Sequence, residues 1–168
     1  MTTAAEPNYI LSAGLGRFAS QDANAAKHFG PQASEKTREL LALSIAQARD
    51  AGFEVIGEDM NPGDPDDTND AGFEVIGEDM NPGDPDDTIK RFSAQLESRQ
   101  WVAVNVGYGI RGNKDHTVLF ERILEACRTT RPEAKIIFSN GPDEVFTAIK
   151  RNFPESLQTG FDMVVMSV

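Results

Sequence analysis

A tandem duplication constrains this chain more than any other feature. Residues 50–68, DAGFEVIGEDMNPGDPDDT, return letter for letter as residues 70–88, with Asn69 between the two copies. Stacked repeat proteins need at least three units, and the sequence contains no third copy. The pattern therefore indicates a recent or engineered duplication inside one domain, which we expect to span residues 1–168.

The composition predicts an ordinary folded protein. Hydrophobic residues make up 39% of the 168 residues and charged residues 26%, which is typical of a globular domain. The sequence lacks an apolar run long enough to cross a membrane, and the start MTTAAEPN lacks a signal-peptide pattern. We expect a cytoplasmic protein with no membrane partner, and a single cysteine, Cys127, fits a reducing compartment.

The acidity of the chain comes largely from the duplication. Residues 69–88 carry seven acidic residues and no Lys or Arg, so the net charge of −11 becomes −4 without them. Nonspecific nucleic-acid binding depends on clustered Lys and Arg that neutralise phosphates. We therefore expect no nucleic-acid partner.

Strand-like and helix-like segments alternate along the chain. The β-prone runs are residues 9–13, 53–58, 101–106, 135–139 and 161–166, and the amphipathic runs begin near residues 35, 89, 115 and 143. Ser34 is the expected N-cap of the first helix. This alternation predicts an α/β fold with three layers, in which a mainly parallel sheet of about five strands has the order 2-1-3-4-5.

The two copies of the repeat compete for one place in this sheet. The run that begins at Phe53 alternates apolar and acidic residues, which suits an edge strand in position 2. We expect copy two to occupy that position, because it leads directly into the helix near Ile89. Copy one would then form an additional segment, and its exchange between protomers would produce a homodimer.

Two glycine-rich turns mark a candidate ligand site. In the predicted strand order, the turn after the first strand (Gly14, Gly16 and Arg17) lies beside the turn after the third strand. That second turn contains Gly107, Gly109, Arg111 and Gly112, and Asn140 follows the next strand. The arginines could hold a phosphate or carboxylate, which predicts an anionic small molecule or nucleotide as partner, or they could be solvated surface residues.

The glycines of the second turn also have other interpretations. The run from Gly107 to Gly112 matches G-x-G-x-x-G, which can be a tight structural turn, a general anion site or a dinucleotide site. The motif follows the third predicted strand rather than the first. The next strand ends at Ser139 and Asn140, so the acidic residue that binds a ribose is absent. The sequence indicates no particular cofactor.

Several metal and nucleophile sites are not supported. The two histidines, His28 and His116, and a cysteine expected on a buried helix face provide neither a zinc site nor a Cys–His pair. The acidic loop 59–64 has Asp64 where a calcium-binding EF-hand loop requires glycine, so we expect no metal site there. G-x-S-x-G is absent, which gives no hydrolase nucleophile.

The predicted architecture resembles flavodoxins and response-regulator receivers, although their defining residues are missing. The first turn lacks a hydroxyl-rich phosphate loop, and the third strand ends at Asn105, Val106 and Gly107 without an aspartate. The chain more closely resembles a set of small uncharacterised α/β proteins of bacteria and fungi, which are Rossmann-like or flavodoxin-like. They share the G-x-G-x-R turn, a Leu-Phe pair as at Leu119 and Phe120, and a strand like residues 134–142. This resemblance covers about residues 71–153, although copy two departs from the pattern. It implies the fold, with no activity attached.

Three functions remain open at this stage. The first is a domain that binds an anionic metabolite or nucleotide at the edge formed by Gly14 and Gly107. The second is an enzyme that uses the same crevice, with His116 or Asn140 in the chemistry, which requires these groups to converge on a pocket. The third is an interaction module without a ligand, which a convex strand edge would favour.

Overall fold

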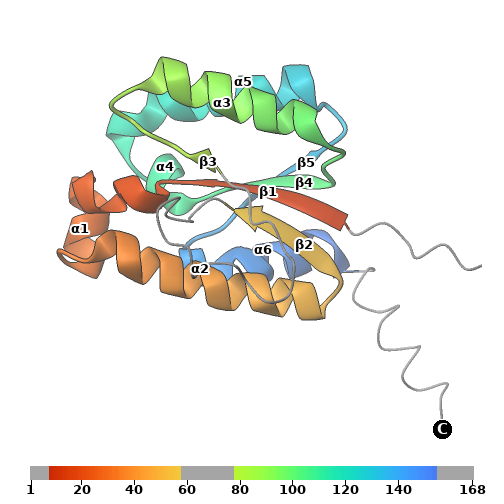
Figure 1. Ribbon diagram of the computed structural model, residues 1–168, viewed down its shortest axis with the longest axis horizontal. Helices are drawn as coiled ribbons and strands as arrows, with labels where there is room; N and C mark the ends of the chain where they lie inside the picture. Colours follow the sequence, from red (N-terminus) through yellow and green to blue (C-terminus); the bar gives the residue numbers. More distant parts are fainter. Residues whose placement is uncertain (1–7, 58–77, 155–168) are drawn as a thin grey trace, which may run out of the picture.

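A computed structural model describes residues 8–57 and 78–154 of the chain (Figure 1). The strands are β1 (Asn8–Gly14), β2 (Phe53–Gly57), β3 (Glu78–Asp79), β4 (Ala103–Val106) and β5 (Lys135–Phe138). The α-helices are α1 (Ala23–Phe29), α2 (Ala33–Asp50), α3 (Pro85–Ser98), α4 (Tyr108–Arg111), α5 (Thr117–Thr130) and α6 (Val145–Asn152). Short 3₁₀ helices occur at η1 (Gly16–Gln21), η2 (Lys114–His116) and η3 (Pro142–Glu144). None of the helices in this part of the chain is long and apolar enough to span a membrane.

All strand pairs are parallel, which confirms an α/β fold with a parallel sheet. The predicted five-stranded sheet of order 2-1-3-4-5 was wrong. The strands run β2-β1-β4-β5, while β3 has two residues and lies off this path, paired with β1. More of the described residues lie in helices than in strands. The strand expected at residues 161–166 lies outside the described residues.

The two copies of the repeat together build one edge of the sheet. In copy one, Phe53 to Gly57 pair in order with Asn8 to Ser12 of β1. In copy two, Glu78 and Asp79 take the next two partners on β1, Ala13 and Gly14. The sequence of β2 followed by β3 is FEVIGED, which is the uninterrupted sequence of a single copy. The two strands therefore form one composite strand, which residues 58–77 interrupt.

The side chains support this continuity across the junction. Successive strand residues point to opposite faces of a sheet. Phe53, the first residue of the composite strand, packs in the core cluster on the α2 and α6 face. Met80, which follows the composite strand as its eighth position, packs in the cluster on the other face. An uninterrupted strand places its first and eighth residues on opposite faces in the same way.

The expectation that copy two would occupy the edge position was wrong for most of the strand. Copy one follows α2 after only a turn, in which Gly52 has a φ of 86° that favours glycine. Copy two keeps the short connection into α3, where Asp84 is the N-cap and its side chain accepts from the Asp87 N–H. At each end of the composite strand, the copy with the shorter connection to the neighbouring helix forms the strand. The strand changes from one copy to the other between Gly57 and Glu78.

Helices cover both faces of the sheet and create two apolar clusters. Figure 1 shows α3 and α5 on one face and α2 and α6 on the other. On the first face, Leu11 and Val104 of the sheet pack with Phe92 of α3 and Ile123 of α5. On the second face, the buried residues are Ile10 and Ala103 of the sheet, Ala48 of α2 and Ile149 of α6. The alternation along β1 and β4 thus decides which helices each strand contacts.

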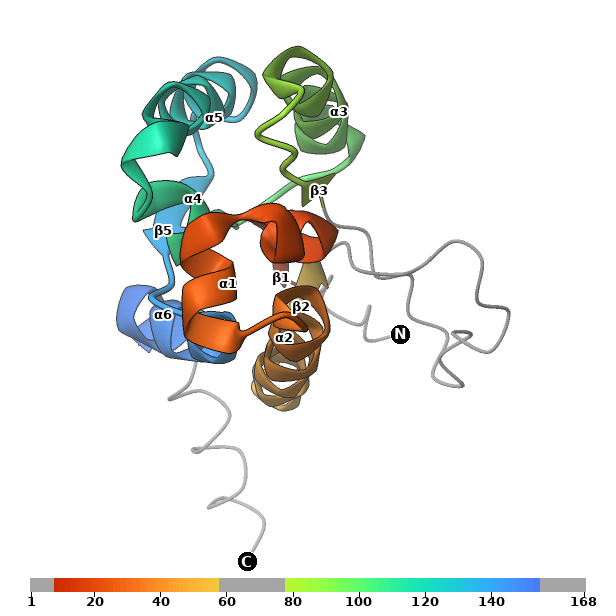
Figure 2. The same ribbon diagram turned by 90° about the vertical axis from the view of Figure 1, so that its left-hand side faces the viewer.

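The connection between β1 and α2 is largely helical. It forms η1 and α1, which Figure 2 shows at the near end of the molecule, above the end of α2. Asp22 caps α1, and Gly30 follows the helix with a φ of 76°. The expected cap of α2 was also wrong. Gln32 is its N-cap, while the Ser34 hydroxyl donates to Arg17 O at 2.8 Å and accepts from Ser20 N at 3.0 Å.

Candidate functional site

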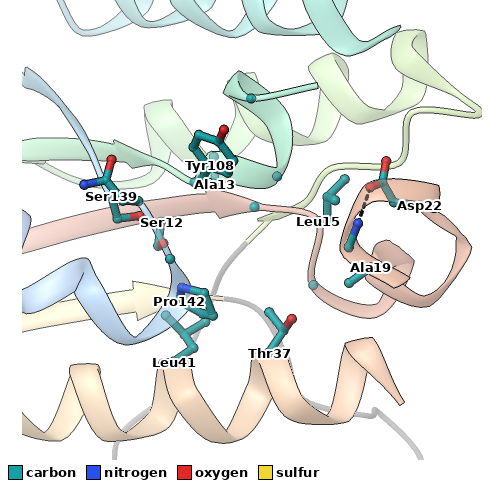
Figure 3. A pocket seen from close by; sticks show the side chains of 18 of the residues that line it. Ser12, Ala13, Leu15, Ala19, Asp22, Thr37, Leu41, Tyr108, Ser139 and Pro142 are labelled. Carbon is teal, nitrogen blue, oxygen red and sulfur yellow. Dashed lines mark hydrogen bonds between the residues drawn. The ribbon is translucent and has the colours of Figure 1, made fainter. Parts of the chain in front are cut away.

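A cleft of about 610 Å³ opens at the carboxyl ends of β1, β4 and β5 (Figure 3). This is where parallel α/β sheets commonly bind ligands. The cleft volume falls in the usual range for small-molecule pockets. Its lining comes from the ends of these strands, from η1 and α1, from the first half of α2, and from the turn that contains η3.

On the α2 and α6 face, the strands β1 and β4 and the residue after β5 present polar, uncharged side chains to the cleft. Ser12 of β1 and Asn105 of β4 are register partners, and Ser139 follows β5. All three residues are buried. They lie on the α2 and α6 face, continuing the alternation from Ile10 and Ala103. This face is therefore apolar in the core and becomes polar at the cleft.

Asn105 has an unsatisfied hydrogen-bonding atom. Its Nδ2 donates to Ser12 Oγ at 3.1 Å, whereas Oδ1 is buried without a partner. The residue as a whole is 1% exposed. Leaving a buried polar atom unpaired costs about 1–3 kcal/mol, so such an atom in a native fold requires an explanation.

Apolar side chains form part of the remaining walls of the cleft. Figure 3 shows Leu15 and Ala19 on one side, and Leu41 below, near Pro142. Phe29 and Val145 also line the space. Most of these apolar side chains come from the helical connection after β1 and from α2, so this connection forms one side of the cleft.

Most of the site residues expected from sequence line this cleft. They are Gly14, Gly16, Gly107, Gly109, Gly112 and Asn140. Packing explains two of these glycines. A Cβ at Gly109 would lie 2.8 Å from Leu15 Cδ1, and a Cβ at Gly112 would lie 2.5 Å from the Tyr108 ring. None of the glycines between Gly107 and Gly112 has a positive φ. The structure therefore favours the tight structural turn among the interpretations of G-x-G-x-x-G.

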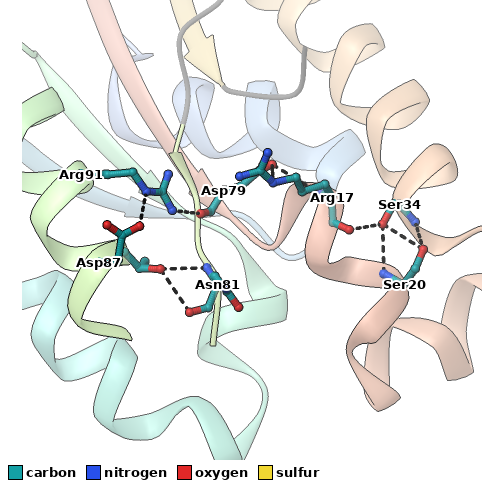
Figure 4. A network of polar contacts seen from close by, with 8 residues as sticks. Arg17, Ser20, Ser34, Asp79, Asn81, Asp87 and Arg91 are labelled. Carbon is teal, nitrogen blue, oxygen red and sulfur yellow. Dashed lines mark hydrogen bonds and ion pairs between the residues drawn. The ribbon is translucent and has the colours of Figure 1, made fainter. Parts of the chain in front are cut away.

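The two arginines are absent from the cleft lining and have other partners. Arg17 Nε lies 3.3 Å from Asp79 Oδ2, and Figure 4 shows this pair beside the end of the composite strand. Arg111 donates to Asn140 Oδ1 at 3.0 Å and to Ser139 O at 3.4 Å. Its guanidinium also lies over the Tyr108 ring. The structure therefore does not bring the two arginines together as an anion clamp.

The protein's own carboxylate occupies the turn after β1. Asp79 is 3% exposed, and its Oδ2 also accepts from the backbone N–H of Arg17 at 3.4 Å. Asp79 Oδ1 lies so close to Gly16 that a Cβ at that position would collide with it. Gly16 also has a φ of 47°, which favours glycine. The turn that the sequence indicated as an anion site thus already holds an internal anion.

A second buried carboxylate, Asp22, connects α1 to the start of α5. Its Oδ1 accepts from the Ala25 N–H at 2.8 Å and caps α1. Its Oδ2 accepts from Asn113 Nδ2 at 3.0 Å and from His116 Nε2 at 2.7 Å. Burial raises the pKa of Asp22, but the hydrogen bonds from Ala25, His116 and Asn113 and the charge of His116 outweigh burial, so the pKa is lowered overall. An ionised carboxylate can only accept hydrogen bonds. The Nε2 atom of His116 therefore carries the proton that it donates to Asp22.

The groups suggested for enzyme chemistry do not converge. Asn140 lines the cleft, but its amide contacts Arg111 and Glu144. His116 is 8% exposed and is absent from the lining, although its partner Asp22 lines the cleft. Cys127 is buried, as expected, and burial raises the pKa of its thiol to about 12, which makes it a poor nucleophile.

The charges around the cleft are mainly negative. Within the described ranges, the lining contains Asp22 and Asp79 but no Lys or Arg, and His28 is its histidine. The residues of known placement contain no group of three or more His, Cys, Asp or Glu residues that could hold a metal ion. Sequence reasoning missed Asp22. Its position before an Ala-rich run that ends at Gly30 was an available helix signal.

The fold and the cleft define an α/β protein with a parallel sheet and a ligand-sized cleft at its carboxyl edge. Comparisons of the chain with protein-family models, curated proteins and solved structures find no match. The resemblance to Rossmann-like or flavodoxin-like proteins of bacteria and fungi stays a prediction.

Proposed function

We propose that this protein binds a small molecule in the cleft at the carboxyl ends of β1, β4 and β5. The observation that carries the proposal is the cleft itself, which combines apolar walls with buried polar groups on the sheet. Small-molecule sites combine apolar walls with polar groups that orient the ligand. An anionic metabolite or nucleotide remains among the ligands to test, although the arginines expected to hold it are outside the lining.

The substitution Gly14→Val tests this proposal. Gly14 ends β1 on the cleft side, and a Cβ built there meets no heavy atom within 4 Å. A valine should therefore fill part of the cleft, and β-branched residues are well accepted in strands. We expect ligand affinity to fall at least about tenfold while the free energy of unfolding changes by less than about 1 kcal/mol.

Binding can be measured by thermal shift and ligand-observed NMR with a panel of nucleosides, nucleotides, sugars, amino acids and organic acids. Val118→Thr, on an exposed position of α5, is the control and should bind as the unmodified protein does. The proposal is rejected if none of the panel binds, or if every compound that binds does so equally well to Gly14→Val.

Homodimer formation through the duplicated segment also stays a prediction. Seven residues from the two copies already complete the edge of the sheet beside β1. An enzyme function likewise stays a prediction. The groups expected to carry its chemistry, His116 and Asn140, do not meet in the cleft.

A further inference from the structure

Ser12 and Asn105 line the cleft as register partners on two neighbouring strands of the sheet. Both belong to strands with neighbours on two sides, where apolar residues are usual. Asn105 is 1% exposed and lines the cleft, and its Oδ1 lacks a hydrogen-bond partner. A chain selected for stability alone would place apolar side chains at this pair. The pair therefore indicates a ligand that supplies the missing donor.

The charges of the cleft indicate what this ligand is not. Asp22 and Asp79 contribute the carboxylates of the lining, and the groups that pair with them, His116 and Arg17, are outside it. Arg17 and Arg111 are occupied by protein partners. An anionic ligand would meet like charge without a Lys or Arg from the lining to pair with it. An uncharged ligand escapes this repulsion.

The walls add a requirement on shape and polarity. Leu15, Phe29, Leu41 and Val145 border the same space as the polar residues of the sheet. A suitable ligand therefore has apolar faces together with an edge that carries hydrogen-bond donors. Uncharged nitrogen heterocycles with an amino or carboxamide group have both properties, and the cleft volume of about 610 Å³ accommodates molecules of nucleoside size.

We propose that the ligand is an uncharged nitrogen heterocycle of nucleoside size, whose N–H group donates to Asn105 Oδ1. This inference rests on the proposed function of the cleft and names its ligand class. Asn105 acts as the specificity-determining residue, and Ser12 orients its amide through the hydrogen bond to Nδ2.

Matched pairs of compounds test the charge requirement. Adenosine and cytidine each have an uncharged N–H donor, and AMP and CMP add a phosphate to them. We expect at least one uncharged member to bind, and its phosphorylated counterpart to bind at least about tenfold more weakly. Inorganic phosphate should not displace the bound compound.

The double variant Ser12→Ala/Asn105→Leu tests the proposed roles of Ser12 and Asn105 in ligand binding. Replacing both partners of a buried hydrogen bond with apolar groups of similar shape can be neutral or stabilising, and here it also removes an unpaired oxygen. We expect the melting temperature of the free protein to stay the same or rise, while affinity for the uncharged compound falls at least about tenfold. Loss of binding with gain of stability is not the signature of a purely structural residue.

A buried serine outside the cleft serves as the matched control. Ser44 is fully buried in α2, and its Oγ accepts from the Phe146 N–H at 2.8 Å. Ser44→Ala should lower stability and leave affinity unchanged, which is the reverse of the double variant.

Two results would overturn this ligand class while the proposed function stands. One is tighter binding of the phosphorylated compounds, with that binding lost in Gly14→Val. The other is unchanged affinity of an uncharged compound for Ser12→Ala/Asn105→Leu. Binding that survives Gly14→Val, or a panel without any binder, would instead reject the cleft as a site and the ligand class with it.

Discussion

Replacing Asp22 with alanine is expected to lower the free energy of unfolding by about 3–5 kcal/mol, because losing a helix cap costs about 1 kcal/mol and each buried donor left unpaired costs about 1–3 kcal/mol. The substitution removes the cap of α1 and leaves the donors of Asn113 and His116 without their shared acceptor. Asp22 links the segment of η1 and α1 to the start of α5. Urea unfolding followed by circular dichroism measures the effect.

The matched control is Asp84→Ala. Asp84 also caps a helix, α3, through a hydrogen bond from Asp87 N–H, but that bond is exposed. Its loss should cost only about 1 kcal/mol, the typical value for a cap. Equal losses for the two variants would show that the contacts of Asp22 with His116 and Asn113 contribute little.

The pH dependence of the Asp22 contribution follows from its lowered pKa. A carboxyl whose pKa is lower in the folded state contributes stability above its unfolded pKa, about 3.9, and loses it as pH falls through the folded pKa. The difference in stability between the unmodified protein and Asp22→Ala should therefore be full at pH 7 and shrink below about pH 4. Urea titrations at a series of pH values measure this difference, and a constant difference down to pH 2 would contradict the prediction.

Deleting residues 58–77 is expected to preserve the fold and to raise the free energy of unfolding by about 2–3 kcal/mol. The deletion joins Gly57 to Glu78, whose partners on β1, Ser12 and Ala13, are consecutive. A continuous strand no longer bears the entropy cost of closing a 20-residue insertion. Because the copies are identical, removing residues 69–88 produces the same 148-residue chain. Denaturant unfolding compares the two proteins.

A second variant separates the length of the insertion from its sequence. Replacing residues 58–77 with 20 Gly and Ser residues keeps the length but removes the alternative strand. We expect its stability to match that of the unmodified protein, since the composite strand is unchanged. A deletion variant that unfolds more readily than the full chain would contradict the composite strand. If the predicted homodimer forms through the duplication, sedimentation should also show that the deletion makes it a monomer.

Local sequence patterns predicted most of the helices and the strands of the described sheet. The apolar runs that include Val104 and Ile137 became β4 and β5, and the spacing of Phe92 and Leu96 marked α3. These features are local, because a side-chain period of two or 3.6 residues is visible in a short window. The helix α1 was missed because its residues contribute no buried apolar stripe, and only its cap and its final glycine mark it.

The candidate site was predictable in position but not in chemistry. Glycines after β1 and β4 indicated the edge where the cleft lies. The roles of Arg17 and Arg111 depended on partners far away in the chain, Asp79 and Asn140, which no local pattern reveals. The same holds for Asn105, whose importance rests on an atom that remains unpaired after the strands have assembled.

The sequence by itself determined the alternation of strands and helices, the acidity and the presence of two identical segments competing for one edge. Only the tertiary structure decided which copy occupies each part of the edge, since two identical sequences provide no local preference between Phe53 and Phe73. The short connections to α2 and α3 favour copy one at the start of the strand and copy two at its end. The same assembly places the carboxylate of Asp79 in the first turn and encloses the cleft with polar groups of the sheet, because hydrogen bonds and burial depend on residues that are distant in sequence.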